Sequence, residues 1–430
     1  MKFVSTSGAA PPADLSTALL AGLAPDGGLY VPEAIEALPL GRFDACTTLP
    51  QVARVFLKPF FEGDPRLADL RSICDQTLDI ETPLVPLAKN ASLLELFHGP
   101  TAAFKDYGAR FLANCLGRLR EGDLRPLTIL VATSGDTGSA VAAAFHRVPG
   151  FRVVILYPDG RVSKRQAHQL GSFGDNVLAL RVPSGFDQCQ SLAKQAFADA
   201  ELRAHVPLSS ANSISLGRLL PQATYYAYAS LLHARATSRP LSFIVPTGNL
   251  GNAVAALIAR SAGLPIARVL LAANRNAAVP EFIAEGAYRP RPSLTTLANA
   301  MDVGDPSNMA RLRFMMSRDP ELLRALAAVS VDDETIRERI RSGERDYGKV
   351  FCPHTACAIE MLERERRLGS KDDFCVVATA HPAKFEDVVE PLVGHSLEPP
   401  PALRAMLARN ASSEAMPPEY ESLKARLLRL

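Results

Sequence analysis

The sequence predicts a multi-domain protein with parallel α/β architecture, and two observations carry this prediction. First, a short β-branched apolar run, a loop of small residues and a long amphipathic stretch recur in that order along the chain. Strand, loop and helix in this order form the repeating unit of parallel sheets. The clearest units are residues 127–147, 151–170, 241–263 and 374–393. Second, the 430 residues exceed what one hydrophobic core usually organises, so we expect more than one domain.

The composition is that of a globular protein and argues against several kinds of partner. Hydrophobic residues make up 47% of the chain, and its 47 basic and 45 acidic residues are interspersed, for a net charge of +2. Without a basic block, we expect neither nucleic acid nor a membrane as partner. The first residues lack an apolar signal region and no apolar run could span a membrane, which predicts a cytoplasmic protein. The seven scattered cysteines contain no CxxC pair, so we expect reduced thiols and no metal site.

The two ends of the chain differ from the repeating units. Residues 1 to about 90 are punctuated by proline and glycine and contain short helices such as 64–76, which predicts an accessory N-terminal domain. The segment 78–87 is expected to be a strand that enters the main body. Residues 396–430 contain the proline run EPPP and predict a helical tail with two short surface helices.

A lysine on an apolar helix face is the first chemical signal. In a helix that starts at Thr101, Lys105 lies on the same side as Gly108, Ala109, Leu112 and Leu116, while Asp106, Arg110 and Asn114 lie on the other. With Thr101 as the N-cap, the helix dipole and the apolar neighbours of Lys105 both disfavour its positive charge. A lysine with a lowered pKa is suited to form a Schiff base with an aldehyde.

The loop 246–252, with the sequence PTGNLGN, is suited to bind a phosphate. It joins a predicted strand to a helix, so free N–H groups and the positive end of the helix dipole meet there, beside Gly248, Asn249, Leu250, Gly251 and Asn252. It matches neither the dinucleotide fingerprint nor the P-loop. The alternative is a tight turn that needs glycine only for its backbone angles. Together with Lys105, a phosphate loop favours pyridoxal 5'-phosphate as the cofactor.

Two further loops follow predicted strands and offer polar groups. Hydroxyl and backbone donors for a carboxylate or phosphate come from Thr133, Ser134, Gly135, Asp136, Thr137 and Gly138, although Asp136 could instead cap the next helix. The loop 376–385 contains Thr379, His381 and Lys384, and Thr379 could be a helix cap or a ligand hydroxyl. In α/β proteins, ligands bind at the carboxyl ends of parallel strands, where we expect these loops.

The motifs, in this order, resemble threonine synthases of the longer bacterial and fungal type. The resemblance extends from about residue 30 to about residue 395 and is carried by ELFHGPTAAFKDYGARF, TILVATSGDTGSAVA, VVILYPDGRVS, SSANSISLGRLL, VPTGNLGN, LANAMDVGDPSN and TAHPAKF. It implies a fold-type II pyridoxal phosphate enzyme, similar to tryptophan synthase β, with two parallel-rich α/β domains and an N-terminal accessory domain. We expect the accessory domain at 1–90, the large cofactor domain at 91–126 and 215–395, the small domain at 127–214 and the tail at 396–430.

The resemblance also implies an activity and a role for each motif. The expected reaction converts O-phospho-L-homoserine and water into L-threonine and phosphate, with Lys105 bound to pyridoxal phosphate and acting as general base. The cofactor phosphate is expected at residues 248–252, its pyridine nitrogen at Thr379 and its ring near Asn212. The resemblance implies that residues 133–138, Ser213 and Ser215 bind the substrate. The candidate cationic partners of the anionic groups of the substrate are Lys164, Arg161, Arg110 and Lys384.

The chain departs from the family pattern at three positions, and alternatives stay open. Ser215 stands where an asparagine is common, Lys164 where a proline is common, and Ala102 where a leucine is usual. The nearest alternative is a related phospho-lyase that releases 2-oxobutyrate, ammonia and phosphate from the same substrate. A serine or threonine dehydratase or β-synthase of the same fold, or a cofactor-binding protein without turnover, is more distant. A monomer and a homodimer are both compatible with the sequence.

Overall fold

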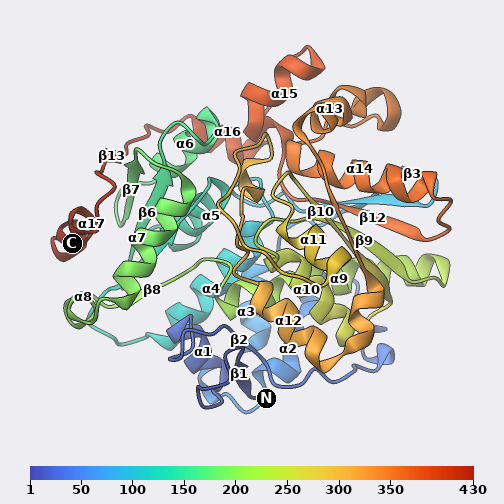
Figure 1. Cartoon of the computed structure of the whole chain (residues 1–430). Coiled ribbons are helices and arrows are strands. Elements are labelled where there is room, and N and C mark those ends of the chain that lie inside the picture. Colours follow the sequence, from blue (N-terminus) through green and yellow to red (C-terminus); the bar gives the residue numbers. More distant parts are fainter.

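The computed structural model describes residues 1–430, which form two mainly parallel sheets side by side and an N-terminal unit of helices (Figure 1). The predicted α/β fold with parallel sheets and an N-terminal domain is therefore confirmed. Assigning the sheets to separate domains with boundaries at residues 126 and 214 stays a prediction. None of the helices combines the length and the hydrophobicity that crossing a membrane requires.

The larger sheet has six strands in the order β11-β10-β9-β12-β4-β3. Their bounds are β3 Leu84–Ala88, β4 Ala91–Glu95, β9 Leu241–Pro246, β10 Ile266–Ala273, β11 Leu326–Ser330 and β12 Asp373–Ala378, and only β3 and β4 pair antiparallel. Strands β9 and β12 are buried along their whole length, since helices cover both faces. Phe243 packs with α9 and α10, whereas its neighbour Ile244 packs with α14 on the opposite face.

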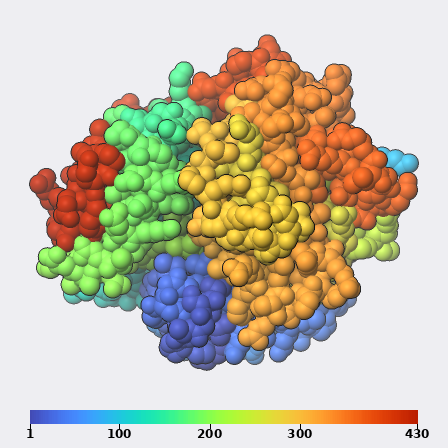
Figure 2. Space-filling model, viewed as in Figure 1, coloured from blue at the N-terminus to red at the C-terminus, as the bar shows by residue number.

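The smaller sheet has five parallel strands in the order β13-β7-β6-β5-β8. Their bounds are β5 Leu127–Ala132, β6 Phe151–Pro158, β7 Val177–Val182, β8 Leu208–Ser209 and β13 Glu414–Ala415. The tail therefore contributes an edge strand, β13, beside β7, in addition to its two predicted helices. Figure 2 shows the tail along the outer edge of this part of the molecule.

Seventeen helices connect and cover the two sheets. They are α1 Leu15–Ala21, α2 Leu49–Phe61, α3 Leu70–Thr77, α4 Lys105–Leu119, α5 Asp136–Phe145, α6 Lys164–Gly171, α7 Phe186–Ala198, α8 Ala200–His205, α9 Leu216–Thr237, α10 Gly251–Ser261, α11 Ala278–Glu285, α12 Met309–Arg318, α13 Asp333–Tyr347, α14 Pro353–Arg367, α15 Glu386–Val393, α16 Pro401–Leu407 and α17 Tyr420–Leu428. The predicted helix 64–76 is shorter, because Asp69 accepts a hydrogen bond from the Ser72 N–H and starts α3 anew.

The N-terminal unit packs directly on the core of the large sheet. Its short strands β1, Phe3–Ser5, and β2, Tyr30–Pro32, pair antiparallel, and helix α2 lies against α9. Phe56 and Leu57 of α2 belong to the same hydrophobic cluster as Tyr225 of α9. The boundary of the accessory domain at residue 90 stays a prediction; β3, which ends just before it, pairs with β4 in the six-stranded sheet.

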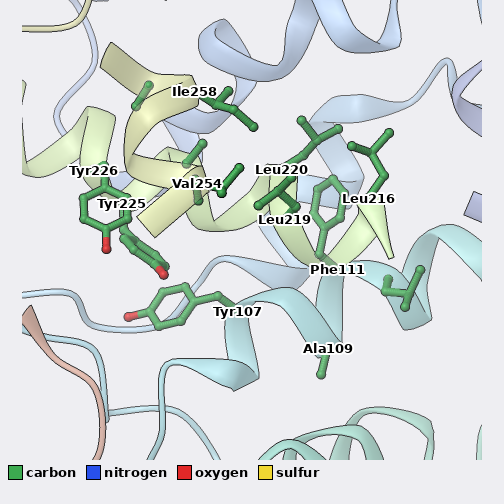
Figure 3. Packing of buried hydrophobic residues seen from close by; sticks show 14 of the residues in the cluster. Tyr107, Ala109, Phe111, Leu216, Leu219, Leu220, Tyr225, Tyr226, Val254 and Ile258 are labelled. Atoms are coloured by element: carbon green, nitrogen blue, oxygen red, sulfur yellow. The ribbon is translucent and has the colours of Figure 1, made fainter. Parts of the chain in front are cut away.

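Helix α9 is the centre around which α4 and α10 are packed (Figure 3). The labelled side chains that meet there are Tyr107, Ala109 and Phe111 of α4, Leu216, Leu219, Leu220, Tyr225 and Tyr226 of α9, and Val254 and Ile258 of α10. The contact between α4 and α9 is so close that a Cβ at Gly108 would lie 2.7 Å from the Arg218 carbonyl oxygen. Gly108 thus sets the distance between these two helices.

Two glycines of α4 provide a matched test of this packing. Gly108→Ala should destabilise the protein by about 1–3 kcal/mol, because the methyl group overlaps the backbone of α9. Gly117→Ala, in the same helix but with open space around its Cβ, should stabilise it by about 0.5–1 kcal/mol through helix propensity. Denaturant unfolding of both variants checks the prediction, and equal effects would contradict it.

Candidate active site

A cavity lies where the loops after β5, β9 and β12 meet, at the carboxyl ends of strands from both sheets. The structure brings thirteen of the predicted residues to its wall: Lys105, Thr133, Ser134, Asp136, Thr137, Asn212, Ser213, Gly248, Asn249, Leu250, Gly251, Asn252 and Thr379. These residues come from five separate stretches of sequence. The parallel strand arrangement is what places them around one space.

Lys105 is the first residue of α4 and lines the cavity. Desolvation lowers the pKa of Lys105 to about 8, although the nearby Asp136 carboxylate opposes the shift. A much larger fraction of this amine is neutral at neutral pH than of an ordinary lysine. Lys105 therefore has the lowered pKa, and with it the neutral amine, that a nucleophile or a general base requires.

The turn before Lys105 differs from the predicted one. Thr101 does not cap the helix, since α4 begins four residues later and Ala102 has a positive φ of 54°. Instead, the Thr101 N–H and hydroxyl donate to the Asp106 carboxylate at 2.9 and 2.7 Å. The helix pattern places Asp106 on the side opposite the apolar face, yet Asp106 is buried, because it closes this turn. Gly99 is required there, as its Cβ would lie 2.5 Å from Asp106 Oδ2.

A buried ion pair joins the two sheets beside Lys105. Lys384 Nζ lies 2.9 Å from Asp136 Oδ1 and donates to the Thr101 carbonyl at 2.6 Å, and Gln166 also donates to Asp136 at 2.9 Å. Burial opposes ionisation of Asp136, but Lys384 and Lys105 hold its pKa below the ordinary value. Asp136 is the first residue of α5 and Gly135 is its N-cap, so Asp136 is not the predicted cap. Lys384 is therefore neutralised by Asp136 and is not a free cationic partner for a ligand.

The loop 246–252 forms a cradle for an anion, which we call the phosphate cup. Leu250 has a positive φ of 61°, and a Cβ at Gly248 would lie 2.6 Å from Met301 Cα, so only glycine fits there. Helix α10 begins at Gly251 without a side-chain cap, which leaves its first N–H groups for a ligand. The Thr247 hydroxyl and Asn252 Nδ2 are buried without partners. These unused donors fit a phosphate.

Asn249 supports the phosphate cup from behind. Its Nδ2 donates to Ser213 Oγ at 2.6 Å, its Oδ1 accepts from the Ser307 N–H at 2.6 Å, and its carbonyl accepts from Asn308 Nδ2 at 2.9 Å. Its side chain is thus used to hold the loop in place. Asn252 is held by the hydroxyls of Tyr225 and Tyr226, which donate to its Oδ1.

Several predicted residues do not line the cavity. Lys164 is the first residue of α6, directly after the N-cap Ser163, and its side chain is 87% exposed beside Asp387. Arg161 donates to Thr295 at 3.1 Å, and Arg110 pairs with Asp79 at 2.6 Å on the far side of α4. Ser215 is fully buried as the N-cap residue of α9.

Gly135 and Gly138 act in the packing of their loop and do not line the cavity. Gly135 has a φ of 128°, which other residues rarely adopt, and a Cβ at Gly138 would lie 2.6 Å from Leu170 Cδ2. Thr133 Oγ1 accepts hydrogen bonds from both glycine N–H groups, at 3.0 and 2.9 Å. Among the residues of this loop, Ser134 and Thr137 remain as hydroxyls at the cavity wall.

Four polar residues of the cavity wall were not predicted from the sequence: Gln190, Arg218, Gln222 and His354. Arg218 is 1% exposed, donates from Nη1 to the Ala211 carbonyl at 2.5 Å and keeps a buried Nε without a partner. His354 accepts a hydrogen bond from the Ala300 N–H at its Nε2, 3.1 Å away. Arg218 could have been found by the argument used for Lys105, since it interrupts the apolar stretch of α9 in LGRLLPQ.

Burial keeps His354 neutral, and this produces a pH dependence of stability. Burial lowers the pKa of His354 from 6.5 to about 4, so between these values the unfolded chain binds one more proton than the folded one. The free energy of unfolding should therefore fall as the pH is lowered from 6.5 to 4, with up to about 3 kcal/mol from this residue. His354→Gln should flatten the pH dependence in denaturant unfolding, whereas His205→Gln, at an exposed residue, should not. Identical slopes in all three proteins would contradict the assignment.

Comparison with known families agrees with this geometry. The profile of the family "Threonine synthase N terminus" matches residues 2–78, "Pyridoxal-phosphate dependent enzyme" matches residues 77–380, and "Threonine synthase, C-terminal" matches residues 355–426. The second of these covers more than half of the chain. The prediction of a pyridoxal phosphate enzyme is confirmed.

Individual relatives are similar over nearly the whole length. The chain is 36% identical to the threonine synthase of Escherichia coli K12 over 409 residues, which is 95% of this chain and 94% of that protein. The crystal structure of threonine synthase from E. coli superposes with a TM-score of 0.93 at 35% identity and full coverage of both chains. That of PLP-bound threonine synthase from Brucella melitensis gives 0.90 at 34% identity, covering 100% of this chain and 99% of that one. The chain belongs to the threonine synthase family of pyridoxal-phosphate-dependent enzymes.

Proposed function

We propose that this enzyme converts O-phospho-L-homoserine and water into L-threonine and phosphate. The observation that carries the proposal is the combination of three features around one cavity: the amine of Lys105, the phosphate cup and the guanidinium of Arg218. A cofactor phosphate and a phosphorylated substrate need separate partners, and the cavity provides both. The names of the full-length relatives support the same reaction.

The residues of the cavity fit pyridoxal phosphate. Lys105 would hold its aldehyde carbon, the N–H groups of 248–252 with Thr247 and Asn252 would hold its phosphate, and Asn212 and Thr379 would lie along its ring. When bound, the cofactor supplies an electron sink that stabilises negative charge on the substrate carbons near the amino group. A neutral hydroxyl such as that of Thr379 does not favour a protonated pyridine nitrogen.

Lys105 is proposed to move protons as well as to hold the cofactor. Its Nζ takes a proton from the α carbon of the substrate and, once it has given that proton up and is neutral again, takes a proton from the β carbon. With its pKa lowered to about 8, the neutral amine is available for this near neutral pH. The Asp136 carboxylate stabilises the ammonium that forms, because the two groups interact in a buried environment.

Arg218 is the proposed partner of the substrate phosphate. Of the cations suggested by the sequence, Arg110, Arg161 and Lys164 lie away from the cavity, and Lys384 is paired with Asp136. Arg218 lines the cavity and makes no ion pair. Ser134 and Thr137, at the start of α5, are proposed to bind the substrate carboxylate with the free N–H groups of that helix.

The proposal also covers the cellular location and the partners of the enzyme. All seven cysteines are buried and unpaired, which suits a reducing compartment, so we propose a cytoplasmic location. The proposed partner is a small-molecule substrate, with no nucleic acid. The oligomeric state, a monomer or a homodimer, stays a prediction.

Product analysis distinguishes this proposal from the phospho-lyase alternative. The full-length enzyme, supplied with pyridoxal phosphate and O-phospho-L-homoserine, should release threonine and phosphate in equal amounts. Lys105→Ala should lower turnover at least about 10³-fold and lose the absorbance of the lysine-linked cofactor. The control Lys164→Ala, at an exposed side chain, should retain both. Release of 2-oxobutyrate and ammonia without threonine would establish the alternative.

Arg218 is tested by its effect on a phosphorylated substrate. Arg218→Gln should lower kcat/KM for O-phospho-L-homoserine by about 10²-fold or more, since a buried charge-assisted contact to phosphate is lost. Arg161→Gln is the matched control and should change kcat/KM little. Cofactor absorbance, measured in parallel, should persist in both variants. An unchanged kcat/KM in Arg218→Gln would refute the assignment.

A further inference from the structure

Arg311 is a fully buried cation without a carboxylate partner. It lies in α12, its side chain is 0% exposed, and its pKa is lowered to about 9 by burial alone. Lys384, another buried cation near the cavity, is neutralised by Asp136 at 2.9 Å. A buried charge is costly unless it is paired, so the lack of a counter-ion at Arg311 needs an explanation.

The guanidinium of Arg311 connects three segments that are far apart in sequence. Nε donates to the Tyr30 carbonyl of β2 at 3.0 Å, and Nη2 donates to the Ile214 carbonyl at 2.6 Å. Nη1 donates to Asn308 Oδ1 at 2.7 Å and to the Ser213 carbonyl at 3.3 Å. Thus the N-terminal unit, the loop before α9 and the start of α12 are all held by one side chain.

A chain of two hydrogen bonds leads from Arg311 to the phosphate cup. Arg311 donates to Asn308, and Asn308 Nδ2 donates to the carbonyl of Asn249 at 2.9 Å. Asn308 is itself fully buried, and its Nδ2 would lie only 3.5 Å from a Cβ at Gly251. Arg311 does not line the cavity, so it lies behind the cup and cannot bind a ligand there directly.

We propose that Arg311 is a positioning residue of the phosphate cup, whose charge is balanced by the cofactor phosphate on the other side of the loop 246–252. The inference rests on the proposed function, in which this loop holds that phosphate. In a water-excluded region, a cation and a dianion interact across a layer of residues, because little solvent screens them. Through Tyr30, the same side chain ties the N-terminal unit to cofactor affinity.

The experiment compares two probes that differ only in the phosphate, pyridoxal 5'-phosphate and pyridoxal. Each is titrated by absorbance into the full-length, cofactor-free protein as wild type, Arg311→Gln and Arg235→Gln. Arg235 is the matched control: it also donates from its guanidinium to carbonyls of the N-terminal unit, those of Cys46 and Phe43, but does not line the cavity. We expect Arg311→Gln to raise the dissociation constant of pyridoxal phosphate at least about tenfold and that of pyridoxal less than about threefold. Arg235→Gln should change neither beyond about threefold.

The outcomes separate this inference from the proposed function. Equal loss of affinity for both probes in Arg311→Gln would show a merely structural role and overturn the inference. A wild type that binds both probes equally would refute the phosphate cup itself, and the inference with it. If Arg311→Gln does not fold, Asn308→Ala, which interrupts the hydrogen bonds between Arg311 and Asn249, replaces it. That variant must show the same phosphate-selective loss, and a loss common to both probes would overturn the inference.

Discussion

The ion pair between Lys384 and Asp136 is the interaction on which the arrangement of the site depends. Asp136 is the first residue of α5, which follows strand β5 of the small sheet. Lys384 lies in the segment that follows strand β12 of the large sheet. The same ammonium donates to the Thr101 carbonyl, in the turn that precedes Lys105. One buried pair thus fixes the two sheets and the lysine relative to one another. Breaking such a pair leaves an uncompensated charge, which typically costs about 3–5 kcal/mol.

The charges around the cavity suit ligands that carry several negative charges. Lys105, Arg218 and Arg311 are buried in or behind its wall, and of the four cations there only Lys384 has a carboxylate in direct contact. Low solvent exposure strengthens the field of the others. A cofactor phosphate and a phosphorylated amino acid would supply the missing negative charge.

The local sequence was informative where the polarity or size of a residue differs from that of its neighbours. Lys105 stands out because its neighbours are apolar, and the loops after β5, β9 and β12 stand out because glycine and hydroxyl residues follow buried strands. The same reasoning applied to Arg218 would have worked, since α9 is buried along most of its length. It failed for Lys164, because a position next to a motif does not determine which way a helical side chain points. In the folded chain Lys164 is the first residue of α6 and its side chain points to solvent.

The sequence by itself determined the parallel α/β class, the lysine and the glycine-rich cup, because apolar periodicity and glycine requirements are properties of short stretches. Tertiary structure alone decided which charges neutralise one another. Lys384 and Asp136 are separated by 248 positions and Arg311 and Tyr30 by 281, so no local pattern could pair them. It also decided that Asn249 holds the loop while Asn252 and Thr247 keep free donors. The physical reason is that partners are chosen by distance and desolvation in the folded chain, which sequence spacing does not record.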